Sequence, residues 1–186
     1  MSAKAKNKEY EYKYYEKAKK ALEDHLINKG FHTDFEITGH PKGKAIPEKF
    51  LFKNTGLLNG GKLPTPDIMG LIWTSQENKR KLVVAEFKIN PVFADIFQTK
   101  GYDELFDSDC TYLLSKCSIS ESSRNTMNFI RNNIQLLKTK MGKSEIFIMV
   151  LNAFPKGSPP TLGRLGTETN YLPDDYERLS TLLCDC

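Results

Sequence analysis

Two carboxylates and one lysine are spaced so that they could bind a metal ion and act on a phosphate ester. Asp67 follows Pro66, and after eighteen further residues come Glu86, Phe87 and Lys88 in succession. Hard oxygen ligands without a neighbouring His or Cys favour Mg²⁺ or Mn²⁺ over Zn²⁺. A lysine beside such an ion can orient or deprotonate the attacking water and stabilise the negative charge that develops on the phosphate. These residue types therefore indicate phosphodiester hydrolysis.

A predicted β-hairpin brings these residues together. Residues 67–74 and 81–89 are rich in strand-forming types, and the polar residues between them favour a turn. A turn centred midway between the two runs places Asp67 opposite Glu86. Because side chains alternate along a strand, Glu86 and Lys88 emerge on the same face.

Charged groups in this otherwise apolar strand are costly to bury unless they are paired or coordinate a metal. One interpretation is that Asp67 and Glu86 hold a divalent cation, because two carboxylates at cross-strand distance repel each other. The other is a structural salt bridge between Lys88 and one of the carboxylates. We favour the metal site and keep the salt bridge as the alternative.

This pattern resembles the signature of the PD-(D/E)XK nuclease superfamily, in the variant PD-x18-ExK. The resemblance covers about residues 10–150 and implies a Mg²⁺-dependent (or Mn²⁺-dependent) deoxyribonuclease, which we expect to be an endonuclease. It also implies that Asp67 and Glu86 bind the metal ion, that the Phe87 carbonyl group completes the site and that Lys88 acts on the water. A non-catalytic nucleic-acid-binding module on the same fold is the alternative.

Two further features extend the resemblance. Gln98 and Tyr102 match the QxxxY motif of RecB-type nucleases, on the helix expected after the ExK strand. Residues four apart share one helix face, so both side chains could reach the same phosphate or metal-bound water. The family often places a glutamate on its first helix, and here Glu16 is the first choice for that catalytic residue and Glu11 the second.

The order of the predicted elements indicates an α/β fold with a mixed central sheet flanked by helices. Besides the hairpin, we expect helices over about residues 8–28, 90–106, 118–141 and 173–183, and strands over residues 31–38, 111–115 and 145–151. Asn90 and Pro91 are the expected N-cap and first residue of the second helix. The order agrees with the restriction-endonuclease-like αβββαβ core that the resemblance implies.

Lysines are concentrated in residues 40–63, which we expect to form a basic flap inserted between the first strand and the hairpin. Such residues can grip the phosphates of DNA. The candidate DNA-binding residues are Lys42, Lys44, Lys49, Lys53 and Lys62 in the flap, with Arg124 and Arg131 on the third helix. The alternatives are a solvated loop and, for the helix, long cations that lie over the edge of the core.

Composition limits the remaining possibilities. The 186 residues, of which 39% are hydrophobic, suit one nuclease domain with a C-terminal extension over about residues 152–186. The net charge of +4 does not by itself indicate nucleic-acid binding. No apolar run approaches the length of a membrane span, so we expect a cytoplasmic protein without a membrane partner. An enzyme of this size that cuts both strands of DNA would commonly act as a homodimer.

The four cysteines do not form a recognisable metal motif. Cys110 and Cys117 are separated by six residues, and Cys184 and Cys186 by one. A structural zinc site would usually show two CxxC-type pairs. We therefore expect free thiols in a reducing compartment.

Overall fold

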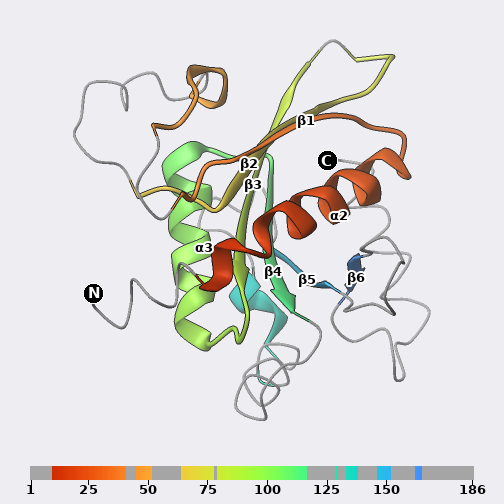
Figure 1. The fold of residues 1–186 in the computed structure, drawn as a ribbon. Coiled ribbons are helices and arrows are strands. Elements are labelled where there is room, and N and C mark those ends of the chain that lie inside the picture. Colours follow the sequence, from red (N-terminus) through yellow and green to blue (C-terminus); the bar gives the residue numbers. More distant parts are fainter. Residues whose placement is uncertain are drawn as a thin grey trace.

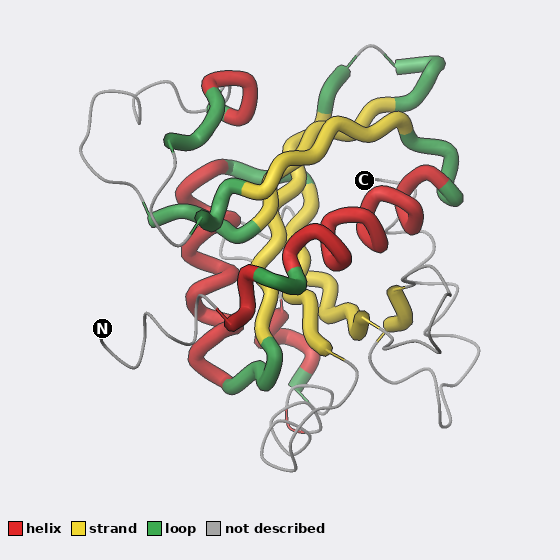
Figure 2. Tube along the Cα trace, in the orientation of Figure 1, coloured by secondary structure: helices red, strands yellow, loops and turns green. Residues whose placement is uncertain are grey.

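The computed structural model describes residues 10–40, 45–51, 64–77, 79–116, 129, 133–137, 146–151 and 162–164. Within them the chain is an α/β protein with a mixed sheet flanked by helices (Figures 1 and 2). The strands are β1 (His32–Ile37), β2 (Ile68–Trp73), β3 (Lys81–Lys88), β4 (Cys110–Lys116), β5 (Ile146–Leu151) and β6 (Leu162–Arg164). The helices are α2 (Tyr15–Ile27) and α3 (Phe93–Phe106), with 3₁₀ turns η1 (Glu48–Phe50) and η3 (Ile134–Leu137).

The described strands form one sheet in the order β1-β2-β3-β4-β5-β6. The first three strands are antiparallel neighbours, β3, β4 and β5 run parallel, and β6 pairs antiparallel with β5. Parallel neighbours need a crossover connection, and α3 supplies it between β3 and β4. Ile68 is the partner of Ala85, so the expected hairpin register, with Asp67 opposite Glu86, is confirmed.

Helices α2 and α3 lie on opposite faces of the sheet, as Figure 1 shows. The apolar residues of β3 alternate between the two cores: Val83, Ala85 and Phe87 pack with α2, whereas Leu82 and Val84 pack with α3. The same alternation places the Glu86 side chain on the α3 face. Asp67 lies opposite Glu86, beside a central strand that is buried on both faces.

The first helix differs from the expected continuous helix over residues 8–28. Residues 10–12 are helical, Lys13 and Tyr14 form a turn, and α2 starts only at Tyr15. Its apolar stripe is buried against the sheet, including Ala18 and Leu22. Gly30 takes a left-handed conformation after the helix, with φ of 88°.

The predicted start of the second helix is wrong by two residues. Asn90 lies in a bend and Pro91 is buried outside the helix, whereas Val92 is the N-cap of α3. The reason is Asp95, whose carboxylate accepts a hydrogen bond of 2.7 Å from the Val92 N–H. A carboxylate in the first turn satisfies an amide that the helix itself cannot bond.

The described part of the expected flap is attached to the sheet rather than extended into solvent. Phe50 in η1 and Leu51 after it are buried in the α3-side core with Met69 and Leu71 of β2. The described residues 45–51 therefore form an anchored segment.

Several expectations fall on parts of the chain that are not described. Of the third helix, the structure describes only residues 129 and 133–137, where η3 is a 3₁₀ turn, and the helix over residues 173–183 lies outside the described residues. The strand β6 was not expected from the sequence.

Cys110 is buried on β4 as a reduced thiol, and the other cysteines lie outside the described residues. No helix in the described part of the chain has the length and apolar character needed to cross a bilayer.

Candidate active site

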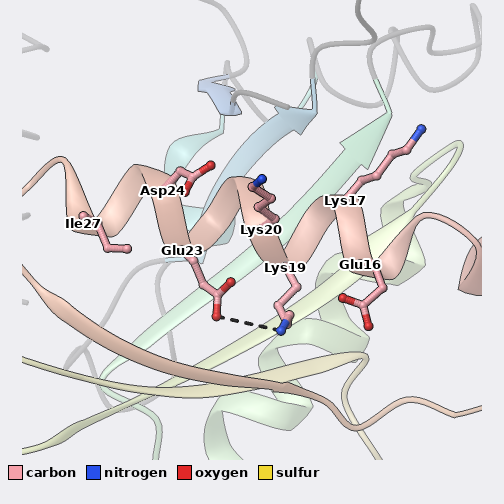
Figure 3. A pocket seen from close by; sticks show the side chains of 7 residues that line it. All are labelled: Glu16, Lys17, Lys19, Lys20, Glu23, Asp24 and Ile27. Atoms are coloured by element: carbon pink, nitrogen blue, oxygen red, sulfur yellow. Dashed lines mark ion pairs between the residues drawn. The ribbon is translucent and has the colours of Figure 1, made fainter. Parts of the chain in front are cut away.

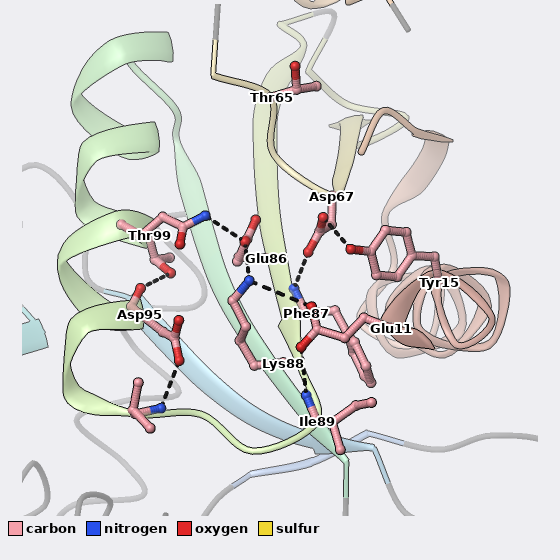
Figure 4. A network of polar contacts seen from close by, with 12 residues as sticks. Glu11, Tyr15, Thr65, Asp67, Glu86, Phe87, Lys88, Ile89, Asp95 and Thr99 are labelled. Atoms are coloured by element: carbon pink, nitrogen blue, oxygen red, sulfur yellow. Dashed lines mark hydrogen bonds and ion pairs between the residues drawn. The ribbon is translucent and has the colours of Figure 1, made fainter. Parts of the chain in front are cut away.

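The candidate catalytic residues meet at the end of the hairpin that is remote from its turn (Figure 4). Asp67 immediately precedes β2, and Glu86 and Lys88 are at the end of β3. Asp67 is 1% exposed and Glu86 is 2% exposed. Both carboxylates are thus withdrawn from bulk water, which strengthens every electrostatic interaction they make.

Both oxygens of the Asp67 carboxylate accept hydrogen bonds from described residues. The hydroxyl group of Tyr15, at the start of α2, donates to Oδ1 at 2.5 Å. The backbone N–H of Phe87, on β3, donates to Oδ2 at 3.0 Å. Tyr15 was not among the site residues expected from the sequence. A tyrosine that is fully buried usually bonds its hydroxyl group to a partner, and this is the one signal that could have drawn attention to it.

Glu86 joins the strand to helix α3. Its Oε1 atom accepts a hydrogen bond of 2.7 Å from the Lys88 ammonium group and one of 2.8 Å from the Gln98 amide. The same amide donates to the hydroxyl oxygen of Tyr102 at 3.0 Å, and that hydroxyl group donates to the Thr65 carbonyl oxygen at 3.2 Å. The structure thus brings Gln98 and Tyr102 to the site, with Gln98 bonded directly to one of the two carboxylates.

Of the two glutamates considered on the first helix, Glu11 reaches the site. Its Oε2 atom lies 3.9 Å from Lys88 Nζ, and its Oε1 atom accepts a hydrogen bond of 3.4 Å from the Ile89 N–H. Glu16, the first choice from the sequence, is exposed on α2, where it lines an open hollow of about 480 Å³ (Figure 3). The structure therefore does not bring Glu16 together with the other candidate residues.

The electrostatics of the site follow from burial and the mutual charges of its members. Burial by itself would lower the pKa of the Lys88 ammonium group, but the charges of Glu86 and Asp67 outweigh it and raise the pKa above its usual value. Burial raises the pKa of the Glu11 carboxyl group, opposed by the charge of Lys88. Burial, followed by the charge of Glu86, raises the pKa of Tyr102 to about 12. Lys88 is therefore an ammonium cation at neutral pH.

The donor set suits a hard divalent cation. The described residues contain no group of three His, Cys, Asp or Glu side chains placed to hold a metal ion, so a site would use the carboxylates of Asp67 and Glu86 with a backbone oxygen. Mg²⁺ commonly binds through one or two carboxylates and keeps several waters. Among the described residues, Glu11, Asp67 and Glu86 are placed around the Lys88 ammonium group, and this concentration of carboxylates at a buried place favours a cation.

The predicted DNA-binding residues are only partly described. The ammonium group of Lys49 forms ion pairs with Asp34 at 2.9 Å and Glu36 at 2.8 Å, both on β1. Lys49 thus attaches η1 to the sheet. The remaining candidates, Lys42, Lys44, Lys53, Lys62, Arg124 and Arg131, lie outside the described residues.

Comparison with known proteins adds no assignment. No protein-family model matches the chain, and no curated protein has significant sequence similarity to it. The residues of the site and their arrangement in the fold are therefore what indicate a function.

Proposed function

We propose that this protein is a metal-dependent nuclease of the PD-(D/E)XK type that hydrolyses phosphodiester bonds in DNA. The observation that carries the proposal is the meeting of Asp67, Glu86, Lys88 and Gln98 at one end of a buried hairpin. Two of these residues are carboxylates opposite each other, one is a cation and one is an amide that fixes a carboxylate. The Gln98 amide on α3 adds a third group to the pair that a salt bridge alone would contain.

The order of the elements supports the same proposal. A helix, three antiparallel strands, a crossover helix and a parallel strand follow one another from α2 to β4. This is the order of a restriction-endonuclease-like core. The candidate residues lie just before the second of these strands, on the third strand and on the crossover helix, as the motif requires.

Each residue has a role in the proposed reaction. Asp67, Glu86 and the carbonyl group of Phe87 would hold Mg²⁺ or Mn²⁺, which would supply Lewis-acid activation of the phosphate and a more acidic bound water. Lys88, as an ammonium group, can donate hydrogen bonds to the attacking water and to a phosphate oxygen, which orients the one and stabilises charge on the other. Gln98 holds the Glu86 carboxylate in place through its 2.8 Å hydrogen bond.

One observation favours a purely structural alternative. The Lys88 and Glu86 side chains are 18% and 3% exposed and lie 2.7 Å apart, as the members of a buried salt bridge would. Breaking such a pair would destabilise the protein by roughly 3–5 kcal/mol. In a nuclease the same pair would keep Lys88 beside the metal ligands, and assays of DNA binding and cleavage distinguish the two interpretations.

The test is cleavage of single-stranded, duplex and branched DNA with Mg²⁺, with Mn²⁺ and with a chelator. The proposal expects metal-dependent cleavage of at least one of these substrates, abolished by the chelator and by Asp67→Asn. DNA binding without any cleavage in either metal would instead identify a non-catalytic binding module. Absence of both binding and cleavage would favour the structural salt bridge.

A further inference from the structure

Tyr15 connects helix α2 to the proposed metal site. Its side chain is completely buried, and its hydroxyl group donates a 2.5 Å hydrogen bond to Oδ1 of Asp67, across 52 positions of the sequence. Figure 4 shows the ring projecting from the helix toward the carboxylate. This is the contact that couples the α2 layer to the Asp67 side chain.

The main chain at Asp67 is fixed by other contacts. The Asp67 carbonyl oxygen accepts hydrogen bonds of 3.0 Å from the N–H groups of both Thr38 and Gly39. The Thr38 hydroxyl group donates to the preceding carbonyl oxygen, that of Pro66, at 2.7 Å. These bonds do not involve Tyr15, so the backbone stays in place if the Tyr15 hydroxyl group is removed.

What remains to be fixed is the rotation of the Asp67 carboxylate. The Tyr15 hydroxyl group donates to Oδ1 and the Phe87 N–H donates to Oδ2, so the two oxygens accept hydrogen bonds from different layers of the fold. The Tyr15 ring is itself well held, because it makes edge-to-face contacts with Tyr12 at 5.4 Å and Phe87 at 6.1 Å between ring centroids. The hydroxyl group thus lies at a defined position relative to β3.

We propose that Tyr15 is a positioning residue, whose hydroxyl group sets the orientation in which Asp67 presents its carboxylate to a divalent cation. The inference rests on the proposed function, because it concerns the same site. Partners that orient a metal-binding side chain commonly change metal affinity or activity by about 10–100-fold when they are removed. Tyr15 would act through Asp67 and without touching the substrate.

The test compares Tyr15→Phe with Tyr112→Phe. Tyr112 on β4 is 1% exposed and belongs to the same core cluster, so the control also removes one hydroxyl group from a buried tyrosine. Calorimetric titration with Mn²⁺ and thermal melting are measured on both variants and on the wild type. We expect the dissociation constant for Mn²⁺ to rise about tenfold or more in Tyr15→Phe and to stay at the wild-type value in Tyr112→Phe.

A double variant separates positioning from a general effect on the fold. In the Asp67→Asn background, Tyr15→Phe should cause no further loss of Mn²⁺ affinity, because the carboxylate that it positions is already gone. A further loss there, or an unchanged Mn²⁺ affinity in the single Tyr15→Phe variant, overturns the role of Tyr15. Failure of the wild-type protein to bind Mn²⁺ at all would instead overturn the proposed function on which the inference rests.

Discussion

The Lys88 ammonium nitrogen lies 2.7 Å from Oε1 of Glu86, two residues earlier on the same strand. Both side chains project to the α3 face of β3, and the Gln98 amide bonds the same carboxylate oxygen. A lysine so placed can neutralise the carboxylate in the metal-free protein. It can also stand beside a phosphate when a metal ion is bound to the carboxylates.

Lys88→Met tests which of these roles matters. The substitution keeps both carboxylates, so Mn²⁺ binding should survive, whereas the cleavage rate should fall by about 100-fold or more because the donor to water and phosphate is lost. The excess of carboxylates should also make the variant gain more thermal stability from added Mn²⁺ than the wild type gains. Cleavage at the wild-type rate would contradict the role of Lys88.

Gly39→Ala tests how closely the site depends on the position of Asp67. A Cβ atom at residue 39 would lie 2.5 Å from Oδ1 and 2.6 Å from the Cα atom of Asp67, so the Asp67 backbone must move. We expect weaker Mn²⁺ binding and a lower melting temperature. In the control, Gly101→Ala on the exposed face of α3, the new Cβ atom meets no atom within 4 Å. It should stabilise the helix by about 1 kcal/mol and leave metal binding unchanged.

The hairpin and its register could be predicted because the information is local. Alternating strand-forming residues on both sides of a short polar turn leave few alternative pairings, and Asp67 lies opposite Glu86 as expected. The proximity of Gln98 and Tyr102 follows from helical spacing for the same reason. Here secondary structure alone is enough to place the side chains.

The remaining site residues depend on contacts between distant parts of the chain. Glu11 rather than Glu16 approaches Lys88, and a turn at Lys13 and Tyr14 separates the two glutamates. No Gly or Pro in the sequence indicates that the first helix is interrupted there. The bond between Tyr15 and Asp67 spans two layers of the fold, and no local pattern encodes it. The three-residue strand β6 is too short to show a periodicity.

The salt dependence of DNA binding distinguishes lysines of residues 40–63 that contact phosphates from those that do not. Lys42, Lys44 and Lys53 changed together to Ala should lower the slope of log affinity against log salt by about 0.9 per lysine on duplex DNA. The control is Lys49→Ala, which should leave the slope unchanged because Lys49 is paired with Asp34 and Glu36. Equal slopes for the triple variant and the wild type would show that these three lysines do not contact phosphates.

His25 on α2 should give the protein a pH-dependent stability. Burial, followed by the charge of Lys29, lowers the pKa of His25 to about 4. Because the pKa in the unfolded chain is higher, near 6.5, the unfolded state binds the proton more tightly, and stability is lost as the pH falls from about 6.5 to 4.

The His25→Gln variant isolates this contribution. Over the same pH range, the free energy of unfolding of the wild type should fall more steeply than that of the variant, by at most about 1.4 kcal/mol per pH unit. Denaturant titrations at several pH values measure the difference. Parallel curves for the two proteins would show that His25 is protonated as readily in the folded as in the unfolded chain.

The proposal of a metal-dependent nuclease is tested most directly by Mn²⁺-dependent nicking of supercoiled DNA. The wild type and Asp67→Ala are compared at equal concentrations of folded protein. The substitution removes one of the two carboxylates that would hold the ion, so nicking should be lost and Mn²⁺ binding should become much weaker. DNA affinity without metal should hold or rise, because a negative charge facing the phosphate has gone. Equal nicking by the two proteins, or a wild type that neither binds Mn²⁺ nor cuts DNA, would contradict the account.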